Sequence, residues 1–260
     1  MQVATACEAR PPIRQAMPIH VVQSGSAATR GTRGTPRCSA CSMRAVCMPA
    51  GLSASELARL DAVICSTRPV KRGDALYRAG DTFQSIYAVR AGSFKTVVMH
   101  RDGREHVTGF QIAGDALGLD GVGAGKQNCD AIALEDSVVC IIPFAQLEAI
   151  CQEMKPMQHH IYQMMSSEIV RESGQMLLLG TMTAEQRVAT FLLNLSKRFK
   201  ARGFSAAEFH LRMTREEIGC YLGMKLETVS RMFSKFQRER LVDTNGKTIR
   251  IVDAAALAQV

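Results

Sequence analysis

The chain lacks several features that would assign it to a common class of protein. No apolar run approaches the roughly 20 residues of a membrane-spanning helix, and the N-terminus has no short apolar core of a secretory signal. No nucleophile–base pair, Walker motif or dinucleotide fingerprint is visible. These absences argue against a membrane protein, a secreted protein and an enzyme. We therefore expect a cytoplasmic location, where cysteine thiols stay reduced.

Basic residues outnumber acidic residues at both ends of the 260-residue chain. Residues 1–37 carry five Lys and Arg against the single acid Glu8, and their Pro, Gly, Ser and Arg content without periodicity predicts a flexible tail. Residues 38–182 carry a net charge of −2, whereas residues 183–260 carry +6. A basic C-terminal third is typical of a nucleic-acid-binding module, although a basic solvated surface would look the same.

Strand-like segments dominate the first half of the chain. Between about residues 68 and 144, short runs rich in Val, Ile, Tyr and Phe are separated by glycines. This pattern predicts an antiparallel β-roll of the jelly-roll type. A short helix should precede it at residues 53–64, where Ser53 and Glu56 form a possible capping box. We expect residues 38–156 to form one domain.

Residues 157–182 have the pattern of a long helix with a heptad seam. Such a seam predicts two helices packing along their length, so we interpret the segment as a dimerisation helix. Glu172 is a charge within the apolar stripe, and two copies of it would repel each other across a partly dry seam. Alternatively, the helix packs on its own domain with Glu172 at the edge. The stripe comprises Tyr162, Met165, Ile169, Glu172, Met176 and Leu179.

Residues 183–260 have the pattern of a winged helix-turn-helix domain. Two capping boxes predict helix starts, a glycine predicts the turn, an amphipathic segment predicts the second helix, and an Asn-Gly pair predicts a hairpin wing. These signals are Thr183 with Gln186, Thr214 with Glu217, Gly223, Leu226–Arg238 and Asn245-Gly246.

The second of these helices carries a candidate surface for reading double-stranded DNA. Glu227, Ser230 and Arg231 lie at i, i+3 and i+4, opposite the apolar side. Arg can bind guanine O6 and N7, Glu can accept from a cytosine amino group, and Ser can bond either partner. The simpler alternative is an exposed Glu227–Arg231 ion pair. Candidate phosphate contacts in the same domain are Lys225, Lys235, Arg238 and Lys247.

Three of the nine cysteines fall within ten residues, in the segment CSACSMRAVC. Cys38, Cys41 and Cys47 offer three thiolates for a metal, but structural zinc and a [4Fe–4S] cluster each need four ligands. The residues alone leave both metals and several fourth ligands open. The remaining candidates are Cys7, Cys65, Cys129, Cys140, Cys151 and Cys220.

From residue 38 to about residue 257 the sequence resembles the FNR (fumarate and nitrate reduction regulator) branch of the CRP/FNR transcription factors. This resemblance implies an α+β fold with an N-terminal β-roll, a long dimerisation helix and a C-terminal winged helix-turn-helix. The motifs that carry it are CSACSMRAVC, LYRAGD, YAVRAG, TGFQIAGDALG, ALEDSVVCIIPF, LLLG, NLSKRF, RGFS, MTREEIGCYLG and LETVSR.

The resemblance also implies a cofactor. In that branch an oxygen-labile [4Fe–4S] cluster is held by the N-terminal cysteine triplet and by one cysteine in the last strand of the roll. The strand matches EDSVVCIIPF, so the implied ligands are Cys38, Cys41, Cys47 and Cys140. Residues 38–156 would then combine an iron–sulfur sensor loop with the β-roll.

The resemblance further implies that the cluster promotes dimerisation, and that the dimer binds a palindrome with half-sites like TTGAT, with RNA polymerase as a protein partner. Glu227, Ser230 and Arg231 match the reading set E-x-x-S-R. Glu172 falls at the acidic position that opposes dimerisation, where the branch usually has Asp. The seam residues beside it are Met165, Ile169 and Met176.

Two regulators on the same fold are alternatives. Cyclic-nucleotide sensors carry a Gly-Glu-Leu phosphate loop and an Arg-Ser/Thr-Ala continuation, whereas this chain reads GDALGLDG and, at 128–131, NCDA. Both the sugar-binding Glu and the phosphate-binding Arg are missing, so we expect no cyclic nucleotide. A structural zinc site in a constitutive regulator is the other alternative, and it would leave the protein colourless and indifferent to air.

Overall fold

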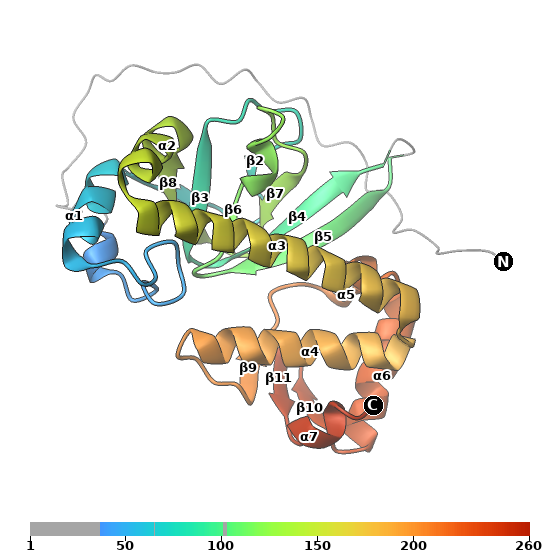
Figure 1. The fold of residues 1–260 in the computed structure, drawn as a ribbon. Coiled ribbons are helices and arrows are strands. Elements are labelled where there is room, and N and C mark those ends of the chain that lie inside the picture. The colour runs from blue at the N-terminus through green and yellow to red at the C-terminus, as the bar shows by residue number, and fades with distance from the viewer. Residues whose placement is uncertain (1–36, 65, 101–102) are drawn as a thin grey trace, which may run out of the picture.

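The computed structural model describes residues 37–64, 66–100 and 103–260, and it confirms the predicted fold class (Figure 1). An antiparallel β-roll is followed by a long helix and then by a helix-turn-helix region with a β-hairpin. The predicted tail at 1–37, except for Arg37, lies outside the described residues, as do Cys7 and Cys65. No helix among the described residues is long and apolar enough to cross a membrane.

Within the described residues, the roll consists of two four-stranded antiparallel sheets, ordered β1-β8-β3-β6 and β2-β7-β4-β5. Alternate residues point to opposite faces of a strand, so Val89, Phe94 and Val139 are buried between the sheets. The strands are β1 Ser66–Val70, β2 Ala75–Tyr77, β3 Ser85–Ala91, β4 Ser93–Met99, β5 Glu105–Ile112, β6 Ala116–Leu117, β7 Asp130–Ala133 and β8 Ser137–Pro143.

Helices cover the outer face of the β1-β8-β3-β6 sheet. Helix α1 (Ala54–Val63) begins at the predicted capping box of Ser53 and Glu56. Helix α2 (Phe144–Glu153), which the sequence analysis did not predict, follows β8 directly. A second apolar cluster fills the space between these helices, the sheet and the start of α3, with members Leu60, Ile86, Ile142, Leu147 and Met157 among others.

Helix α3 (Lys155–Thr181) crosses the molecule beside the roll (Figure 1). Its two ends are held by its own chain, because Met157 and Ile161 are buried near the start and Leu178 near the end. From Ile169 to Leu177 the apolar side chains face outward. The exposed fractions of Ile169, Val170 and Met176 are 64%, 67% and 73%.

The C-terminal region begins with α4 (Ala184–Ala201) and continues through α5 (Arg215–Leu222) and α6 (Leu226–Arg238). Both predicted capping boxes are present, and Gly223 adopts the left-handed conformation at the turn (φ +64°). A three-stranded sheet ordered β10-β11-β9 completes this part of the described chain. The remaining elements are β9 Glu208–His210, β10 Val242–Asn245, β11 Thr248–Ile251 and α7 Ala254–Leu257.

The wing turn lies one residue later than the sequence predicted. Asn245 pairs with Thr248, so the two loop residues are Gly246 and Lys247. Gly246 has a positive φ of +60° and Lys247 does not. Glycine at the first of two central positions is typical of a type II′ turn, whereas the Asn-Gly signal favours type I′.

The roll and the C-terminal region share one apolar core. Phe110 of β5 lies 6.0 Å from Phe191 of α4 and 5.2 Å from Tyr221 of α5, centroid to centroid. Val107 and Val97 of the roll belong to the same buried cluster. The two parts that the sequence presented as separate domains are therefore packed directly on each other.

Gly92 joins β3 to β4 at a point where only glycine fits. Its φ is +90°, and a Cβ atom would lie 2.1 Å from Ser137 Oγ. Gly80 also has a positive φ, +88°, but a Cβ atom there would have no neighbour within 4 Å.

We predict that Gly92→Ala lowers the free energy of unfolding by about 3 kcal/mol, because left-handed strain of about 1–2 kcal/mol adds to an overlap cost of about 1–3 kcal/mol. Gly80→Ala should lower the free energy of unfolding only by the left-handed strain of about 1–2 kcal/mol. Urea unfolding at unchanged slope measures both. Equal losses in the two variants would contradict the assigned overlap.

Candidate functional site

The triplet cysteines lie on one short loop, residues 38–51, which we call the cysteine loop. It is a succession of tight turns, in which Cys41 N donates to Cys38 O at 3.2 Å and Cys47 N donates to Met43 O at 3.0 Å. Asp61 of α1 anchors its start, because its carboxylate accepts from Cys38 N and from Ser39 Oγ. These two hydrogen bonds fix the backbone position of Cys38 at the site.

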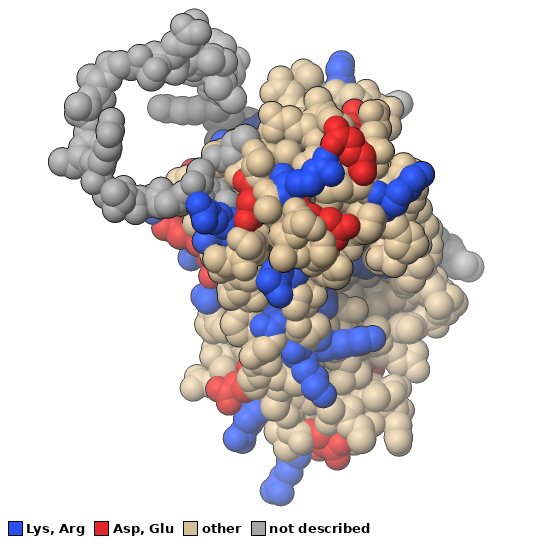
Figure 2. All heavy atoms as spheres, turned by 60° about the vertical axis from the view of Figure 1, so that its left-hand side comes forward, with Lys and Arg blue, Asp and Glu red and all other residues tan. Residues whose placement is uncertain are grey.

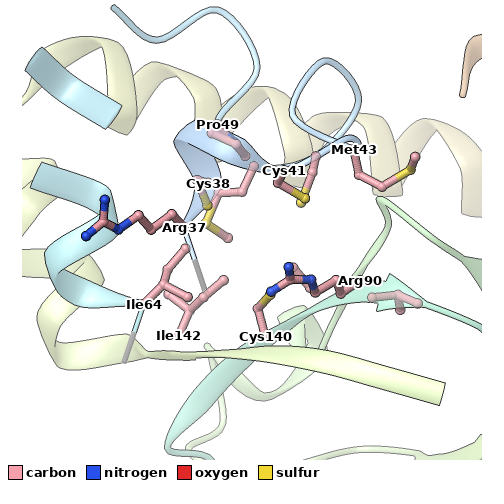
Figure 3. A pocket seen from close by; sticks show the side chains of 13 residues that line it. Arg37, Cys38, Cys41, Met43, Pro49, Ile64, Arg90, Cys140 and Ile142 are labelled. Atoms are coloured by element: carbon pink, nitrogen blue, oxygen red, sulfur yellow. The ribbon is translucent and has the colours of Figure 1, made fainter. Parts of the chain in front are cut away.

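All four implied ligands line one cavity between the cysteine loop and the β1-β8-β3-β6 sheet (Figure 3). Cys140 comes from β8, where it pairs with Ala88 of β3 and Thr67 of β1. In Figure 3, Cys38 and Cys41 face Cys140 across this space. The other lining residues are mostly apolar: Arg37, Met43, Met48, Pro49, Ile64, Ala88, Val89, Arg90 and Ile142.

The other described cysteines lie elsewhere. Cys129 is buried in the roll interior, where its Sγ lies 3.5 Å from Asp120 Oδ2. Cys220 of α5 contacts β5, with Sγ 3.3 Å from Glu105 O. Cys151 lies on α2, at the edge of the apolar cluster beneath the helices. Within the described residues, the cavity thus gathers the set that the resemblance implied.

Burial controls the protonation of two thiols of the cysteine loop, Cys38 and Cys47. It raises the pKa of Cys38 to about 12 and that of Cys47 to about 12, and neighbouring thiols add to both shifts. The Cys38 and Cys47 thiols are therefore neutral at pH 7. A metal cation that binds here must displace their protons, because only the thiolate is a ligand.

The donors fit a metal centre in number and chemistry, but the loop holds them apart. Within residues 37–64, 66–100 and 103–260, no three His, Cys, Asp or Glu side chains are close enough to hold a metal ion. The free volume of the cavity is about 20 Å³, which is room for one water molecule. A four-thiolate centre would therefore require the cysteine loop to reposition its sulfur atoms.

Arg90 is a neighbour of the site that the sequence analysis did not single out. Strand β3 has an irregular register against β8 between Val89 and Ala91, and such bulges re-aim a side chain. The Arg90 guanidinium lies beside Cys140 (Figure 3) and opposes the burial that raises the pKa of this thiol. An arginine inside the otherwise apolar strand SIYAVRA was the available signal.

Helix α6, which the sequence predicts to read DNA, presents the predicted polar face to solvent. Glu227, Ser230 and Arg231 are exposed, whereas Val229 and Phe236 on the other side are fully buried. Among the residues that the structure describes, Arg231 Nη2 donates to Thr228 Oγ1 at 3.3 Å rather than pairing with Glu227. The reading side chains are thus available to a ligand.

Cations surround this face unevenly. Lys225 and Arg238 are exposed, and Lys247 lies in the wing turn with Nζ 3.2 Å from Arg212 O. Lys235, by contrast, forms an ion pair with Glu185 of α4, so its charge is already compensated. Figure 2 shows Lys and Arg outnumbering Asp and Glu on the lower, C-terminal part of the face in view.

The stripe on α3 is divided between two environments. Ile169, Glu172 and Met176 are exposed, as the dimer-seam interpretation expects of one isolated chain. Met165 is half-buried against the apolar cluster beneath the helices, and Leu179 is half-buried against the core shared with α4 and α5. Tyr162 is also exposed, so the outward side of the stripe is interrupted at Met165 and ends before Leu179.

Two family models match the chain in consecutive parts. The model described as "Cyclic nucleotide-binding domain" matches residues 67–154, and the model described as "Crp-like helix-turn-helix domain" matches residues 186–260. The first match covers the roll.

Several known proteins are similar over most of the chain. Transcriptional regulatory protein btr of Bordetella pertussis is 43% identical over 86% of this chain and 92% of its own length. The fumarate and nitrate reduction regulatory protein of Escherichia coli is 40% identical over 93% and 94%. The structure of FixK2 from Bradyrhizobium japonicum is similar with a TM-score of 0.69 and 28% identity, covering 75% of this chain and 96% of that one.

These identities extend through the roll, the long helix and the helix-turn-helix, so they concern the whole described architecture and not one module. The relatives are regulators of transcription rather than enzymes. This chain belongs to the CRP/FNR family of DNA-binding transcription regulators.

Proposed function

We propose that this regulator senses oxygen through a [4Fe–4S] cluster held by Cys38, Cys41, Cys47 and Cys140. The observation that carries the proposal is the convergence of these thiols on one mostly apolar cavity, from a loop and from a strand far apart in the sequence. A cluster of this kind takes four cysteine thiolates and, when bound, supplies an oxygen-labile group.

The chain's own residues prepare this site. Asp61 holds the start of the cysteine loop, and mostly apolar side chains surround the sulfur atoms. The Arg90 guanidinium offers positive charge and N–H donors beside Cys140, and hydrogen bonds to cluster sulfurs tune such centres. A structural zinc site is the remaining alternative for the same thiols, because zinc also takes four.

We propose that two copies of the chain pair along the exposed middle of α3 when the cluster is bound. The loop and the helix are physically linked, because Cys38 and Met48 of the loop pack in the same apolar cluster as Met157 and Ile161 of α3. A change in the loop therefore reaches the start of the helix. About 5.5 kcal/mol is enough to move a two-state population from 1:99 to 99:1.

We propose that the paired protein binds a palindrome with half-sites like TTGAT, read by Glu227, Ser230 and Arg231, with Lys225 and Lys247 on phosphates. Residues 38–156 would act as the sensor, 157–182 as the dimerisation helix and 183–260 as the DNA-binding domain, behind a flexible tail at 1–37. RNA polymerase in the cytoplasm would be the protein partner, and no cyclic nucleotide would be the effector.

The ligand assignment predicts a specific pattern of colour loss. Replacing Cys38, Cys41, Cys47 or Cys140 singly with Ser should abolish the visible absorbance and most of the iron and sulfide of anaerobically prepared protein. Cys129→Ser should retain them, because Cys129 lies in the roll interior. A coloured Cys140→Ser protein would overturn the fourth ligand. A colourless wild type that contains zinc and is unchanged by air would favour the structural zinc alternative.

The reading role predicts different effects for two cations. Arg231→Ala should cost about 1–3 kcal/mol at the cognate site and relax discrimination at the guanine. Lys247→Ala should weaken cognate and scrambled duplexes alike and reduce the salt slope by about 1. Fluorescence anisotropy over a salt series measures both. If Arg231→Ala weakens both duplexes equally, Arg231 does not read a base.

The repulsion at the seam predicts the behaviour of two charge-removing variants. Glu172→Ala in air should lower the dimer dissociation constant at least about tenfold, equivalent to 1.4 kcal/mol, because a carboxylate leaves the seam. Glu168→Ala removes the same charge, but its partner Arg171 lies against Gly109 of the roll, so dimerisation should not change. Sedimentation velocity measures both. A monomeric Glu172→Ala protein would contradict the assigned restraint.

A further inference from the structure

A half-buried ion cluster joins the roll to the C-terminal region next to the cysteine loop. Arg198 Nη2 lies 2.5 Å from Asp115 Oδ2, and Arg202 Nη2 pairs with Asp115 Oδ1. Asp115 belongs to the turn between β5 and β6, whereas both arginines lie at the C-terminal end of α4. The exposed fractions of the Asp115 and Arg202 side chains are 23% and 7%. We call these three residues the Asp115 junction.

The junction is tied into both parts by further hydrogen bonds. Arg198 Nη2 also donates to Phe110 O at 2.8 Å, and Arg202 Nε donates to Ala113 O. The carboxylate accepts from Ile112 N at 2.8 Å, which closes the turn on itself. The arginines therefore bind backbone carbonyl groups of the turn as well as the Asp115 carboxylate.

The other side of the same turn touches the cysteine site. Gly114 N donates to Val89 O at 2.7 Å and Val89 N donates to Asp115 O at 2.9 Å, and Val89 lines the cavity. A Cβ atom on Gly114 would lie 3.0 Å from Val46 Cγ2 and 3.5 Å from Arg202 Nε. Val46 of the cysteine loop thus covers the turn next to the Arg202 guanidinium.

We propose that the Asp115 junction transmits the position of the cysteine loop to α4 within a single chain, by a route separate from the α3 seam. The inference rests on the proposed function in one respect, that metal binding is what moves the loop. As it stands, the loop does not hold its sulfur atoms close enough for a metal, and we infer that filling the site moves Cys47 together with the adjacent Val46. This displacement uncovers Arg202 and admits water to the ion pairs.

The consequence for α4 follows from the physics of ion pairs. A pair shielded from water interacts more strongly than an exposed one, and exposed pairs contribute little. Loss of the cover therefore weakens the hold of Asp115 on Arg198 and Arg202. The C-terminal end of α4 then loosens from the roll, whereas α5 stays attached to β4 through the Lys95–Glu217 pair at 2.9 Å.

A double-mutant cycle in metal-free protein tests this route without any cluster. The readout is hydrogen exchange of the amides of Arg202, Gly203 and Phe204, which donate to carbonyls of α4 at 3.0 Å. Val46→Ala should speed this exchange by about twofold or more, the coupling shown by residues in one network. In an Asp115→Asn background the same change should have no effect.

Arg212→Gln is the matched control. It breaks another ion pair between the two parts, Arg212 Nε to Glu135 Oε2 at 3.0 Å, which has no contact with the cysteine loop in the described structure. Val46→Ala should act in this background as in the wild type. If Asp115→Asn does not fold, Arg202→Gln serves instead, because it removes the pair that Val46 covers and leaves the Arg198–Asp115 pair in place.

Cluster-loaded protein provides the second arm. Loading should speed exchange at the same three amides in the wild type, and should have no effect on them in Asp115→Asn. An equal effect of Val46→Ala with and without Asp115 overturns the inference. So does loading that alters exchange in the cysteine loop but not at the end of α4. If the wild type takes up no cluster, the proposed function fails and the metal-free cycle still decides the inference.

Discussion

The register of β8 is the constraint on which the site depends. Val139 points into the roll and is fully buried between the two sheets. The side chains of Cys140 and Ile142 lie on the opposite, outer face of the same sheet. Because side chains alternate along a strand, a slip of one residue would exchange these faces and remove the fourth thiol from the cavity. Pairing of β8 with β1 on one side and β3 on the other prevents such a slip.

The same sheet face links the cysteine loop to the long helix. The apolar cluster on this face includes Cys38 and Met48 from the loop, Leu147 from α2 and Met157 from α3. Close-packed interiors transmit displacements because they hold few voids. The middle of α3 is free of such packing, with Ile169 and Met176 exposed. A firmly held start and an exposed apolar side in the middle fit the proposal that pairing of this helix responds to the loop.

The contact between the roll and the C-terminal region adds a second connection. Phe110 packs against Phe191 of α4 and Tyr221 of α5, and both of these helices contact α6. The basic residues of the final third therefore fall into two groups. Arg198 and Arg202 are used internally against Asp115, while Arg231 stays exposed for a ligand.

Local signals determined much of this protein. Capping boxes at Ser53, Thr183 and Thr214 and the turn at Gly223 are where the sequence placed them, because caps and left-handed turns depend on residues close together in the chain. The turn predicted from the Asn-Gly pair lies one residue later in the structure, because a type II′ turn places glycine at the first of its two central positions. The cysteine spacing by itself left the metal and the fourth ligand open. Only the tertiary structure placed Cys140, Arg90 and the Asp115 junction around one loop, because contacts between residues far apart depend on sheet register and core packing, which no local pattern encodes.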